Sequence, residues 1–330
     1  MQIDLRTVSI TPLRQTFDHV AKRLGGDKPA SRYQEGTLDV QAKTNYHYRP
    51  TWDPAHKIFD ETRTAIKMKD WYAFKDPRQF YYGSWTQARA RLQETAEGDI
   101  EFVESRGLAS NLSAAVRKLA LELYVPLRHV EWGANMNNAS ICAYGFGTAI
   151  TAPAQFQGMD RLGSAQYLSR LGLLLGGPDD LAAAKNAWLN APAWQELRRY
   201  VEDTFVLSDW FELYVAQNLA LDGLMFPLLF KRVDDHLTSQ AGPTVSMLTR
   251  FQADWFVDAS KWVDATIKTA AAESAENKAQ LEAWTRAWTA RAAKALQPVV
   301  AMALGDAAAG AMEEAMTQFK ARCAKAGLSV

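Results

Sequence analysis

Residues 110–134 read SNLSAAVRKLALELYVPLRHVEWGA, a run in which apolar side chains recur at every third or fourth position. That spacing places them along one face of an α-helix. Pro126 lies inside the run and predicts a kink or a restart, because proline lacks a backbone N–H and crowds the preceding turn. The apolar positions are Leu112, Val116, Leu119, Leu123, Leu127, Val130 and Ala134.

The same periodicity continues through most of the chain after residue 76. Asp76 and Pro77 are favoured at the N-cap and first position of a helix, and Gly107 is favoured just after its end. No segment alternates apolar and polar residues as a strand would, and no repeat of fixed period occurs. Long helices joined by short loops predict an all-α bundle. Further helices are expected at 159–175, from 179, from 192, from Ser208 with Pro227 inside, from 243, and at 312–324, with a glycine-rich break at 145–153.

The first 76 residues have a different character. A short helix is expected from Thr11-Pro12 to Gly25-Gly26, and residues 29–77 then lack helical periodicity. An extended segment cannot bury its aromatic side chains against itself, so these must lie on the chain's own helical body or on a neighbouring chain. We expect residues 1–76 to form an arm and residues 77–330 to form the helical domain. The aromatic side chains of the arm include Tyr33, Tyr46, Tyr48, Trp52, Phe59, Trp71, Tyr72 and Phe74.

Composition excludes some classes of partner. The chain has 37 basic and 37 acidic residues among its 330, so its net charge is zero. A neutral protein has no global field to attract nucleic acid or an anionic membrane. Two cysteines, no signal-peptide pattern and apolar stretches shorter than a membrane span predict a cytoplasmic protein.

The motifs of common catalytic sites are missing from the sequence. The glycine clusters at 145–147 and 176–178 do not extend to a phosphate-binding loop, and there is neither a GxSxG nor a CxxC motif. In helical bundles, a di-iron site uses two Glu-x-x-His pairs and one further Glu from each of two other helices. Only Asp53 and His56 approach such a pair, and they lie in the arm. We therefore expect no catalytic residue and no metal ligand in this chain.

Five acidic residues nevertheless lie on the expected helices. Each could be a solvated surface carboxylate, or a buried polar group at a vanished metal site, paired with Arg or Asn neighbours. Asn135 and Asn138 share a helical stripe with Glu131, which makes that helix the best candidate for a buried polar network. His129, next to an apolar stripe, is expected to be a hydrogen-bonded structural histidine. The five acidic residues are Glu131, Glu212, Asp222, Asp254 and Asp258.

Six motifs, spread in order over nearly the whole chain, resemble the β subunit of the oxygenase component of bacterial phenol hydroxylase. This subunit belongs to the multicomponent di-iron monooxygenases, together with those acting on toluene and methane. The motifs are Ala30-Ser-Arg-Tyr-Gln-Glu35, Lys43-Thr-Asn-Tyr-His-Tyr-Arg-Pro50, Asp76-Pro-Arg-Gln-Phe-Tyr-Tyr-Gly83, residues 126–138 (PLRHVEWGANMNN), Gly158-Met-Asp-Arg-Leu-Gly163 and Asp209-Trp-Phe-Glu212.

The resemblance implies a ferritin-like fold and a metal-free, non-catalytic subunit of an NADH-dependent phenol 2-monooxygenase. A related α subunit would hold the di-iron centre, and with a small γ subunit the hydroxylase would be an (αβγ)₂ assembly. A reductase with flavin and a 2Fe-2S centre and a regulatory protein would complete the system, which converts phenol to catechol. In catalytic relatives a Glu-x-x-His pair is expected where this chain has Glu131 to Ala134.

The resemblance also suggests which surface the arm would contact. We expect it to lie on the α subunit, with Tyr46, Tyr48 and Trp52 as anchors, because aromatic side chains often dominate binding energy at interfaces. Two other functions remain open from the sequence: a stand-alone helical enzyme with an unrecognised pocket, and a helical adaptor unrelated to oxygenases.

Overall fold

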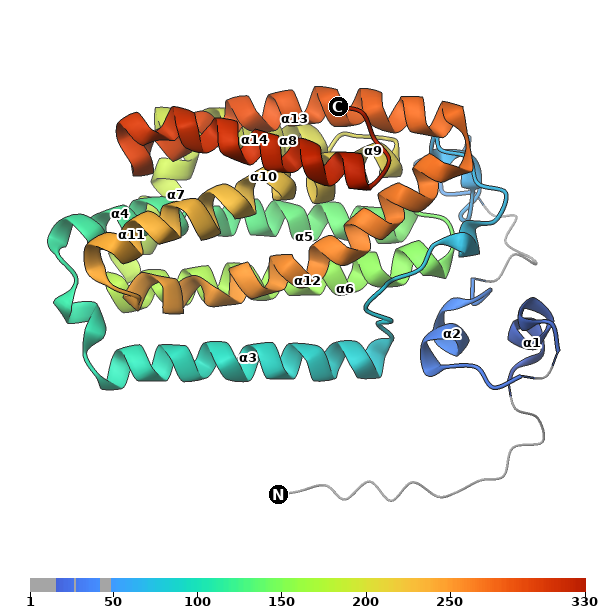
Figure 1. Cartoon of the computed structure of the whole chain (residues 1–330), viewed down its shortest axis with the longest axis horizontal. Coiled ribbons are helices and arrows are strands. Elements are labelled where there is room, and N and C mark those ends of the chain that lie inside the picture. Colours follow the sequence, from blue (N-terminus) through green and yellow to red (C-terminus); the bar gives the residue numbers. More distant parts are fainter. Residues whose placement is uncertain (1–15, 27, 42–48) are drawn as a thin grey trace, which may run out of the picture.

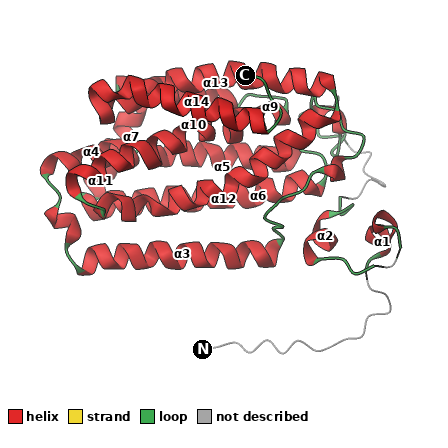
Figure 2. Cartoon of the chain, viewed as in Figure 1, coloured by secondary structure: helices red, strands yellow, loops and turns green. Residues whose placement is uncertain are grey.

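The computed structural model describes residues 16–26, 28–41 and 49–330. Within these residues every regular element is a helix and none is a strand (Figure 2). The predicted all-α class is therefore confirmed.

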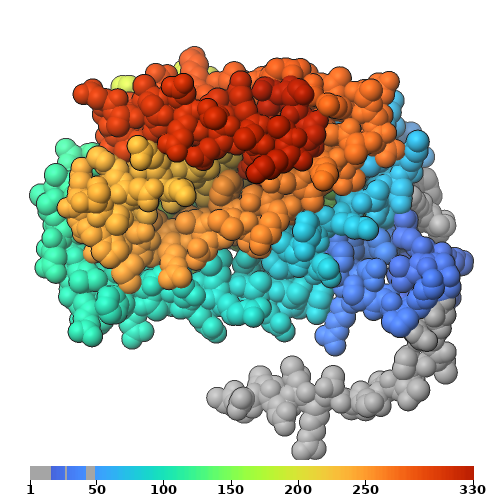
Figure 3. All heavy atoms as spheres, viewed as in Figure 1, coloured from blue at the N-terminus to red at the C-terminus, as the bar shows by residue number. Residues whose placement is uncertain are grey.

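The long helices lie side by side in a layered bundle (Figure 1). They are α3 (Tyr82–Ser105), α5 (Leu127–Tyr144), α6 (Thr148–Leu175), α12 (Thr244–Glu273), α13 (Ala275–Leu304) and α14 (Ala308–Lys325). In the space-filling view, α13 and α14 form one side, α11 and α12 cross beneath them, and α3 lies at the opposite edge (Figure 3). The first described part of the chain, with the short helices α1 (Asp18–Leu24) and α2 (Arg32–Thr37), lies at one end of the bundle.

Several helix boundaries lie where their residue types predict them. Pro126 separates α4 (Ala114–Tyr124) from α5, which confirms the restart expected there. Gly107 follows α3 with a φ of +62°, in the left-handed region that glycine adopts easily. Pro178 and Pro192 open α7 (Pro178–Asn190) and α8 (Pro192–Thr204), where the missing N–H costs no hydrogen bond.

Other boundaries differ from the prediction for local reasons. Helix α3 begins at Tyr82 and not at Asp76, because the buried Asp76 carboxylate accepts hydrogen bonds from the backbone N–H and guanidinium of Arg78. Helix α6 begins at Thr148, so only the residues around Gly147 form the break, and Pro153 lies inside the helix. The prediction for residues 29–77 also missed α2, which Ser31 and Gln34 open with a reciprocal capping box.

A continuous helical segment, residues 210–241, runs through the centre of the bundle. It comprises α9 (Trp210–Tyr214), the π-helical η4 (Val215–Leu221), α10 (Asp222–Pro227), the π-helical η5 (Leu228–Arg232) and α11 (Val233–Ala241). Its N-cap is Asp209 and not Ser208, since the Asp209 carboxylate accepts from the N–H groups of Phe211 and Glu212. Every residue from 213 to 226 is buried.

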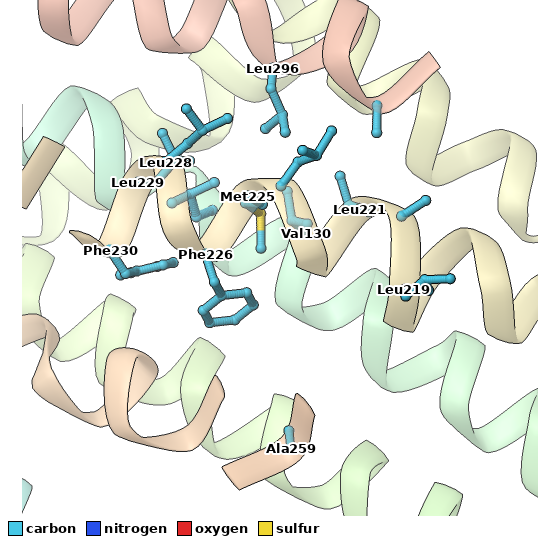
Figure 4. Packing of buried hydrophobic residues seen from close by; sticks show 14 of the residues in the cluster. Val130, Leu219, Leu221, Met225, Phe226, Leu228, Leu229, Phe230, Ala259 and Leu296 are labelled. Carbon is cyan, nitrogen blue, oxygen red and sulfur yellow. The ribbon is translucent and has the colours of Figure 1, made fainter. Parts of the chain in front are cut away.

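Apolar contacts surround this central segment on several sides (Figure 4). Leu228 and Leu229 lie toward Leu296 of α13, while Phe226 extends toward α12, where its ring meets that of Trp255 at 5.3 Å between centroids. A helix that is apolar all round is typical of a core position. Two helical stretches, 210–241 and 275–325, are long and apolar enough to cross a membrane, but the best window of the first is 94% buried inside the fold. The best window of the second is 44% buried, and two such stretches do not by themselves indicate a membrane-spanning protein.

The described arm divides into two parts. Ile66, Trp71 and Phe74 are buried in the core of the helical body, so this part packs on its own chain. Three backbone N–H groups anchor it: Ala65 donates to Asp209 at 2.7 Å, Lys67 to Asn277 at 3.0 Å and Lys69 to Glu273 at 3.0 Å. Nearer the N-terminus, Trp52 is 75% exposed. Of the expected anchors, Tyr46 and Tyr48 lie outside the described residues.

Gly133 of α5 allows α8 to approach closely. A Cβ at this position would lie 2.5 Å from Cγ1 of Val201, a short branched side chain that has little room to move. We expect Gly133→Ala to lower the free energy of unfolding by about 1–3 kcal/mol through overpacking. Gly98→Ala is the matched control, since a Cβ at Gly98 on the exposed side of α3 would meet nothing within 4 Å. It should stabilise the helix by about 0.5–1 kcal/mol, and equal effects of both substitutions in urea unfolding would contradict the packing argument.

Candidate functional site

Three charged side chains from three helices meet in the interior. Arg161 of α6 places its Nε 2.9 Å from a carboxylate oxygen of Glu131 in α5, and its Nη2 donates a hydrogen bond to Asp222 of α10 at 3.0 Å. All three side chains are at most 3% exposed. For Glu131 and Asp222 the structure therefore supports the buried alternative, in which an arginine compensates the carboxylates. We call these three residues the ion triad.

Aromatic rings close the triad off from water. The guanidinium carbon of Arg161 lies 4.9 Å from the ring centroid of Trp255 and 5.2 Å from that of Phe226. A cation over an aromatic face is attracted by the ring quadrupole, more strongly where water is excluded. The aromatic rings thus stabilise the positive charge in a place where hydration cannot.

The charges of the triad do not balance when all three groups are ionised. Burial raises the pKa of Glu131 from its ordinary 4.5 to about 7, although Arg161 opposes that rise. Burial likewise raises the pKa of Asp222, again against the attraction of Arg161. One guanidinium neutralises only one carboxylate, so the pair of carboxyl groups holds a proton up to near-neutral pH.

Buried side-chain amides form two hydrogen-bonded groups, of which one reaches the triad through Asp222; together we call them the amide network. Gln217 donates to Asp222 at 3.0 Å and accepts from Asn137 at 2.9 Å. Asn138 and Asn218 exchange hydrogen bonds at 3.2 and 3.1 Å, and Gln157 also donates to Asn218, at 3.1 Å. Both Gln217 and Asn218 come from the π-helical η4, the turn before Asp222. Side-chain networks of this kind define one register between the helices that contribute to them.

This network confirms part of the sequence prediction and extends it. Asn138 is a member, as expected from its stripe with Glu131. Asn135 instead donates to the backbone carbonyl of Gly158 at 2.7 Å and is half-buried. The sequence reasoning missed Arg161 and the amides of Asn137, Gln157, Gln217 and Asn218. The available signal was polar side chains on otherwise apolar helical stripes.

A second buried carboxylate, Asp160, connects α3, α6 and α12. It accepts hydrogen bonds from the indole N–H groups of Trp85 and Trp255, both at 3.0 Å, and from Nε of Arg89 at 2.8 Å. Burial raises its pKa despite these three donors. Beside it, a surface cavity of about 390 Å³ lies between α3, α6 and α12. Because three donors from α3 and α12 bond to its carboxylate, Asp160 connects these helices to α6 and is not a free acid or base.

The remaining candidate residues have structural roles. Glu212 is half-buried and accepts from the indole of Trp288 at 2.9 Å. Asp254 is exposed, and the half-buried Asp258 pairs with Arg89 at 3.2 Å. Burial lowers the pKa of His129 to about 4, so it is neutral at physiological pH. Its ring stacks on Trp188 at 5.7 Å, and Nε2 is buried without a hydrogen-bond partner, unlike the hydrogen-bonded histidine that was expected.

No group of three or more His, Cys, Asp or Glu side chains is arranged to hold a metal ion in residues 16–26, 28–41 and 49–330. Asp53 and His56 do contact each other at 3.0 Å, but Arg63 completes that cluster in the arm. In the interior, Glu131 and Asp222 both face a guanidinium. Both carboxylates are therefore already paired with a cation of the chain itself.

From Trp132 to Ser169 the outward faces of α5 and α6 lack exposed charge; the partly exposed Arg170 lies beyond this stretch. Between Trp132 and Ser169 the only charged residues are Asp160 and Arg161, and both are buried. Large apolar side chains are exposed on these helices and beside them: Trp132, Met136, Met159, Leu162, Phe205 and Val206. We call this the α5–α6 surface. Subunit interfaces are depleted in charged residues and enriched in Trp and Met at their centres.

Comparison with protein families matches residues 52–274 to the methane, phenol and alkene hydroxylase model. The chain is 50% identical over 330 residues to the phenol 2-monooxygenase oxygenase component DmpL of Pseudomonas sp. (strain CF600), covering 99% of this chain and 98% of that protein. It is 46% identical, with the same coverage, to the corresponding component MhpL of Acinetobacter pittii (strain PHEA-2). It is 22% identical to the hydroxylase component subunit beta of the toluene-4-monooxygenase system of Ectopseudomonas mendocina, covering 94% of this chain and 96% of that one.

Solved structures give the same relationship. A chain of xenon-pressurised phenol hydroxylase from Pseudomonas sp. OX1 superimposes with a TM-score of 0.93 at 44% identity, and the match covers 99% of each chain. A chain of toluene 4-monooxygenase with toluene bound matches with a TM-score of 0.76 at 20% identity, covering 90% of this chain and 99% of that one, which shows a shared fold. The expected ferritin-like long-helix bundle is confirmed.

The shared proton of the triad predicts a pH dependence of stability. Because the folded pKa of Glu131 lies near 7 and its ordinary value is 4.5, the folded state binds more protons between these values than the unfolded state does. The stability from this group is therefore present at low pH and lost as the pH rises through 7, by roughly 1–3 kcal/mol. Glu131→Gln, which keeps the neutral shape, should flatten this dependence in urea unfolding between pH 5.5 and 8.

Two comparisons isolate the effect. His129, with its lowered pKa, changes stability in the opposite direction below pH 6.5, so wild type and Glu131→Gln are compared at each pH. Asp254→Asn, on the exposed side of α12, is the matched control and should keep the wild-type dependence. An unchanged pH dependence in Glu131→Gln would show that the triad does not hold the proton.

Proposed function

Because the chain belongs to the methane, phenol and alkene hydroxylase family, we propose that it is the non-catalytic β subunit of a phenol 2-monooxygenase oxygenase component. The complete enzyme hydroxylates phenol to catechol with O₂ and electrons from NADH. The observation that carries the non-catalytic part is the ion triad, in which Arg161 occupies the coordinating side of both interior carboxylates. The likeness to two phenol 2-monooxygenase components over the full length supports the reaction.

The cofactors would then be divided among several proteins. The di-iron centre belongs to a related α subunit, and flavin and a 2Fe-2S centre belong to a separate reductase. With a small γ subunit the hydroxylase is an (αβγ)₂ assembly, aided by a regulatory protein, and the system works in the cytoplasm. The names of the relatives, an oxygenase component and a hydroxylase component subunit beta, support a division of labour of this kind.

What this chain contributes is a rigid helical partner. The ion triad and amide network fix α5, α6 and α10 relative to one another without a metal. The α5–α6 surface then offers a fixed, uncharged face to the α subunit. Stable subunit contacts bury apolar area with few charges at the centre, which this face supplies.

The arm is the second proposed contact. Trp52 is 75% exposed and lies just beyond the part of the arm that packs on this chain's own core. We propose that Trp52, together with Tyr46 and Tyr48, anchors the arm on the α subunit. The exposed Trp52 is suited to this, because an aromatic side chain brings large contact area at little entropy cost.

The two alternatives from the sequence are less well supported. A stand-alone enzyme needs an acid–base group that is open to substrate, whereas the interior carboxylates here lie behind helices and the Asp160 beside the cavity is held by three donors. An adaptor unrelated to oxygenases does not account for 50% identity along the whole chain. Neither alternative predicts association with a larger iron protein.

Co-expression with the matching α subunit tests the proposed function. A tagged copy of this chain should co-purify with a larger chain that carries about two irons, and phenol hydroxylation should require that complex. Expressed alone, the chain should aggregate or self-associate, because a large uncharged face is left uncovered. Two tightly bound irons on the isolated chain, or phenol hydroxylation by it alone, would refute the proposed role.

A pair of tryptophan substitutions tests the arm contact. Trp52→Ala should weaken assembly with the α subunit by about 2 kcal/mol, roughly thirtyfold in the dissociation constant, because an aromatic anchor is lost. Its melting temperature should stay near the wild-type value, since the side chain is exposed. Trp71→Ala is the control: it removes a buried ring that packs on Phe146 and Trp210, and should lower the melting temperature sharply. Unchanged assembly in Trp52→Ala would remove this anchor from the interface.

A further inference from the structure

Six buried residues lie on four helices with the same distribution and spacing as the ligands of a di-metal site. In ferritin-like di-metal sites, two helices each supply one carboxylate and two others each supply a carboxylate and a histidine three residues apart. Here the single residues are Glu131 of α5 and Asp222 of α10. The pairs at the same three-residue spacing are Arg161 with Ser164 on α6, and Gln252 with Trp255 on α12. None of the six is more than 2% exposed.

Contacts between these residues show that the two pairs and the two single residues converge on one place. Arg161 joins Glu131 and Asp222, and its guanidinium lies over Trp255. Gln252 donates to the hydroxyl of Ser164 at 3.3 Å. The pair positions are thus on α6 and α12, not at Glu131 and Ala134 as the sequence resemblance suggested.

The donor set at these positions does not fit a metal pair. An arginine carries only N–H donors, and an indole offers a donor and no lone pair. The amide of Gln252 and the hydroxyl of Ser164 are neutral where a metal pair needs carboxylate and imidazole. A di-metal site of this kind has four carboxylates. Only two, Glu131 and Asp222, are present here, and both form ion pairs with Arg161.

We infer that this cluster is a di-metal site converted to an internal ion pair, in which the Arg161 guanidinium takes the structural place of the metals. A bound metal pair would compensate several carboxylates and tie four helices together. Arg161 does the same with one charge: it connects α5, α6 and α10 and packs its cation against the Trp255 ring of α12. The number of carboxylates falls from four to two as the positive charge falls to one, and the proton held by the Glu131 and Asp222 pair neutralises the remaining carboxylate. This inference concerns the interior of the chain and does not depend on the reaction or the partner.

A set of variants that restores the ligand types tests the inference in the full-length chain. The quadruple variant Arg161→Glu, Ser164→His, Gln252→Glu and Trp255→His supplies the complete set of four carboxylates and two imidazoles. It should bind about two Co(II) ions per chain, with the visible absorption of a coordinated cobalt. The triple variant that keeps Arg161 should bind cobalt at least about tenfold more weakly, because the guanidinium blocks the two native carboxylates. Equal cobalt binding by both variants, or none by a folded quadruple variant, would overturn the inference.

A second comparison keeps the test decisive if the quadruple variant does not fold. Arg161→Ala leaves two uncompensated carboxylates and a space the size of the missing side chain, so its melting temperature should fall. Free guanidinium at low millimolar concentration should restore part of that loss, relative to sodium at the same ionic strength. Arg161→Met is the matched control, because its side chain fills the space and should prevent recovery. Recovery of Arg161→Ala alone supports a required cation at this position, and absence of recovery or equal behaviour of both variants overturns it.

Discussion

The contact of one guanidinium with two carboxylates, out of reach of water, governs the interior of this protein. A buried ion is stable only where opposite charge and hydrogen bonds replace its hydration. The surroundings of Arg161 meet that condition from several directions: Glu131 and Asp222 supply charge, Gln217 supplies a donor to Asp222, and Trp255 covers the cation. Each contribution comes from a different helix or turn. The helices around it can therefore adopt only the arrangement that keeps all of these contacts together.

The π-helical η4 follows from the same requirement. In η4 the widened turn brings Gln217 and Asn218 into the interior immediately before Asp222, so three polar side chains reach the network from one short segment. A regular α-helix rotates successive residues by about 100° and would direct some of them elsewhere. Single π turns inside helices commonly occur where side chains must be directed to a particular place.

The sequence predicted features that depend on neighbours along the chain, and it missed features that depend on distant partners. Pro126 and Gly107 act through their own backbone geometry, so their helix boundaries could be read directly. The start of α3 could not be predicted in this way. Asp76 accepts hydrogen bonds from Arg78 within a turn and does not cap the helix. The sequence did not predict that Arg161 is buried, because an arginine on a helix is usually solvated and because its two partners come from other helices. For the arm, the number of aromatic residues did not show whether their side chains pack on this chain's own core or on another subunit. The structure shows that residues 64–76 pack on this chain, since their backbone donates hydrogen bonds to Asp209 and Asn277, which lie far along the sequence.

A cation that is part of the polypeptide is present from the moment of synthesis. Arg161 needs no delivery protein, no particular oxidation state and no supply of iron, and it cannot be lost to a chelator. The arrangement of α5, α6 and α10 around this cation is thus uncoupled from metal homeostasis. In a cell short of iron these helices would still pack in their final register, because the charge that holds them together is supplied by the chain itself.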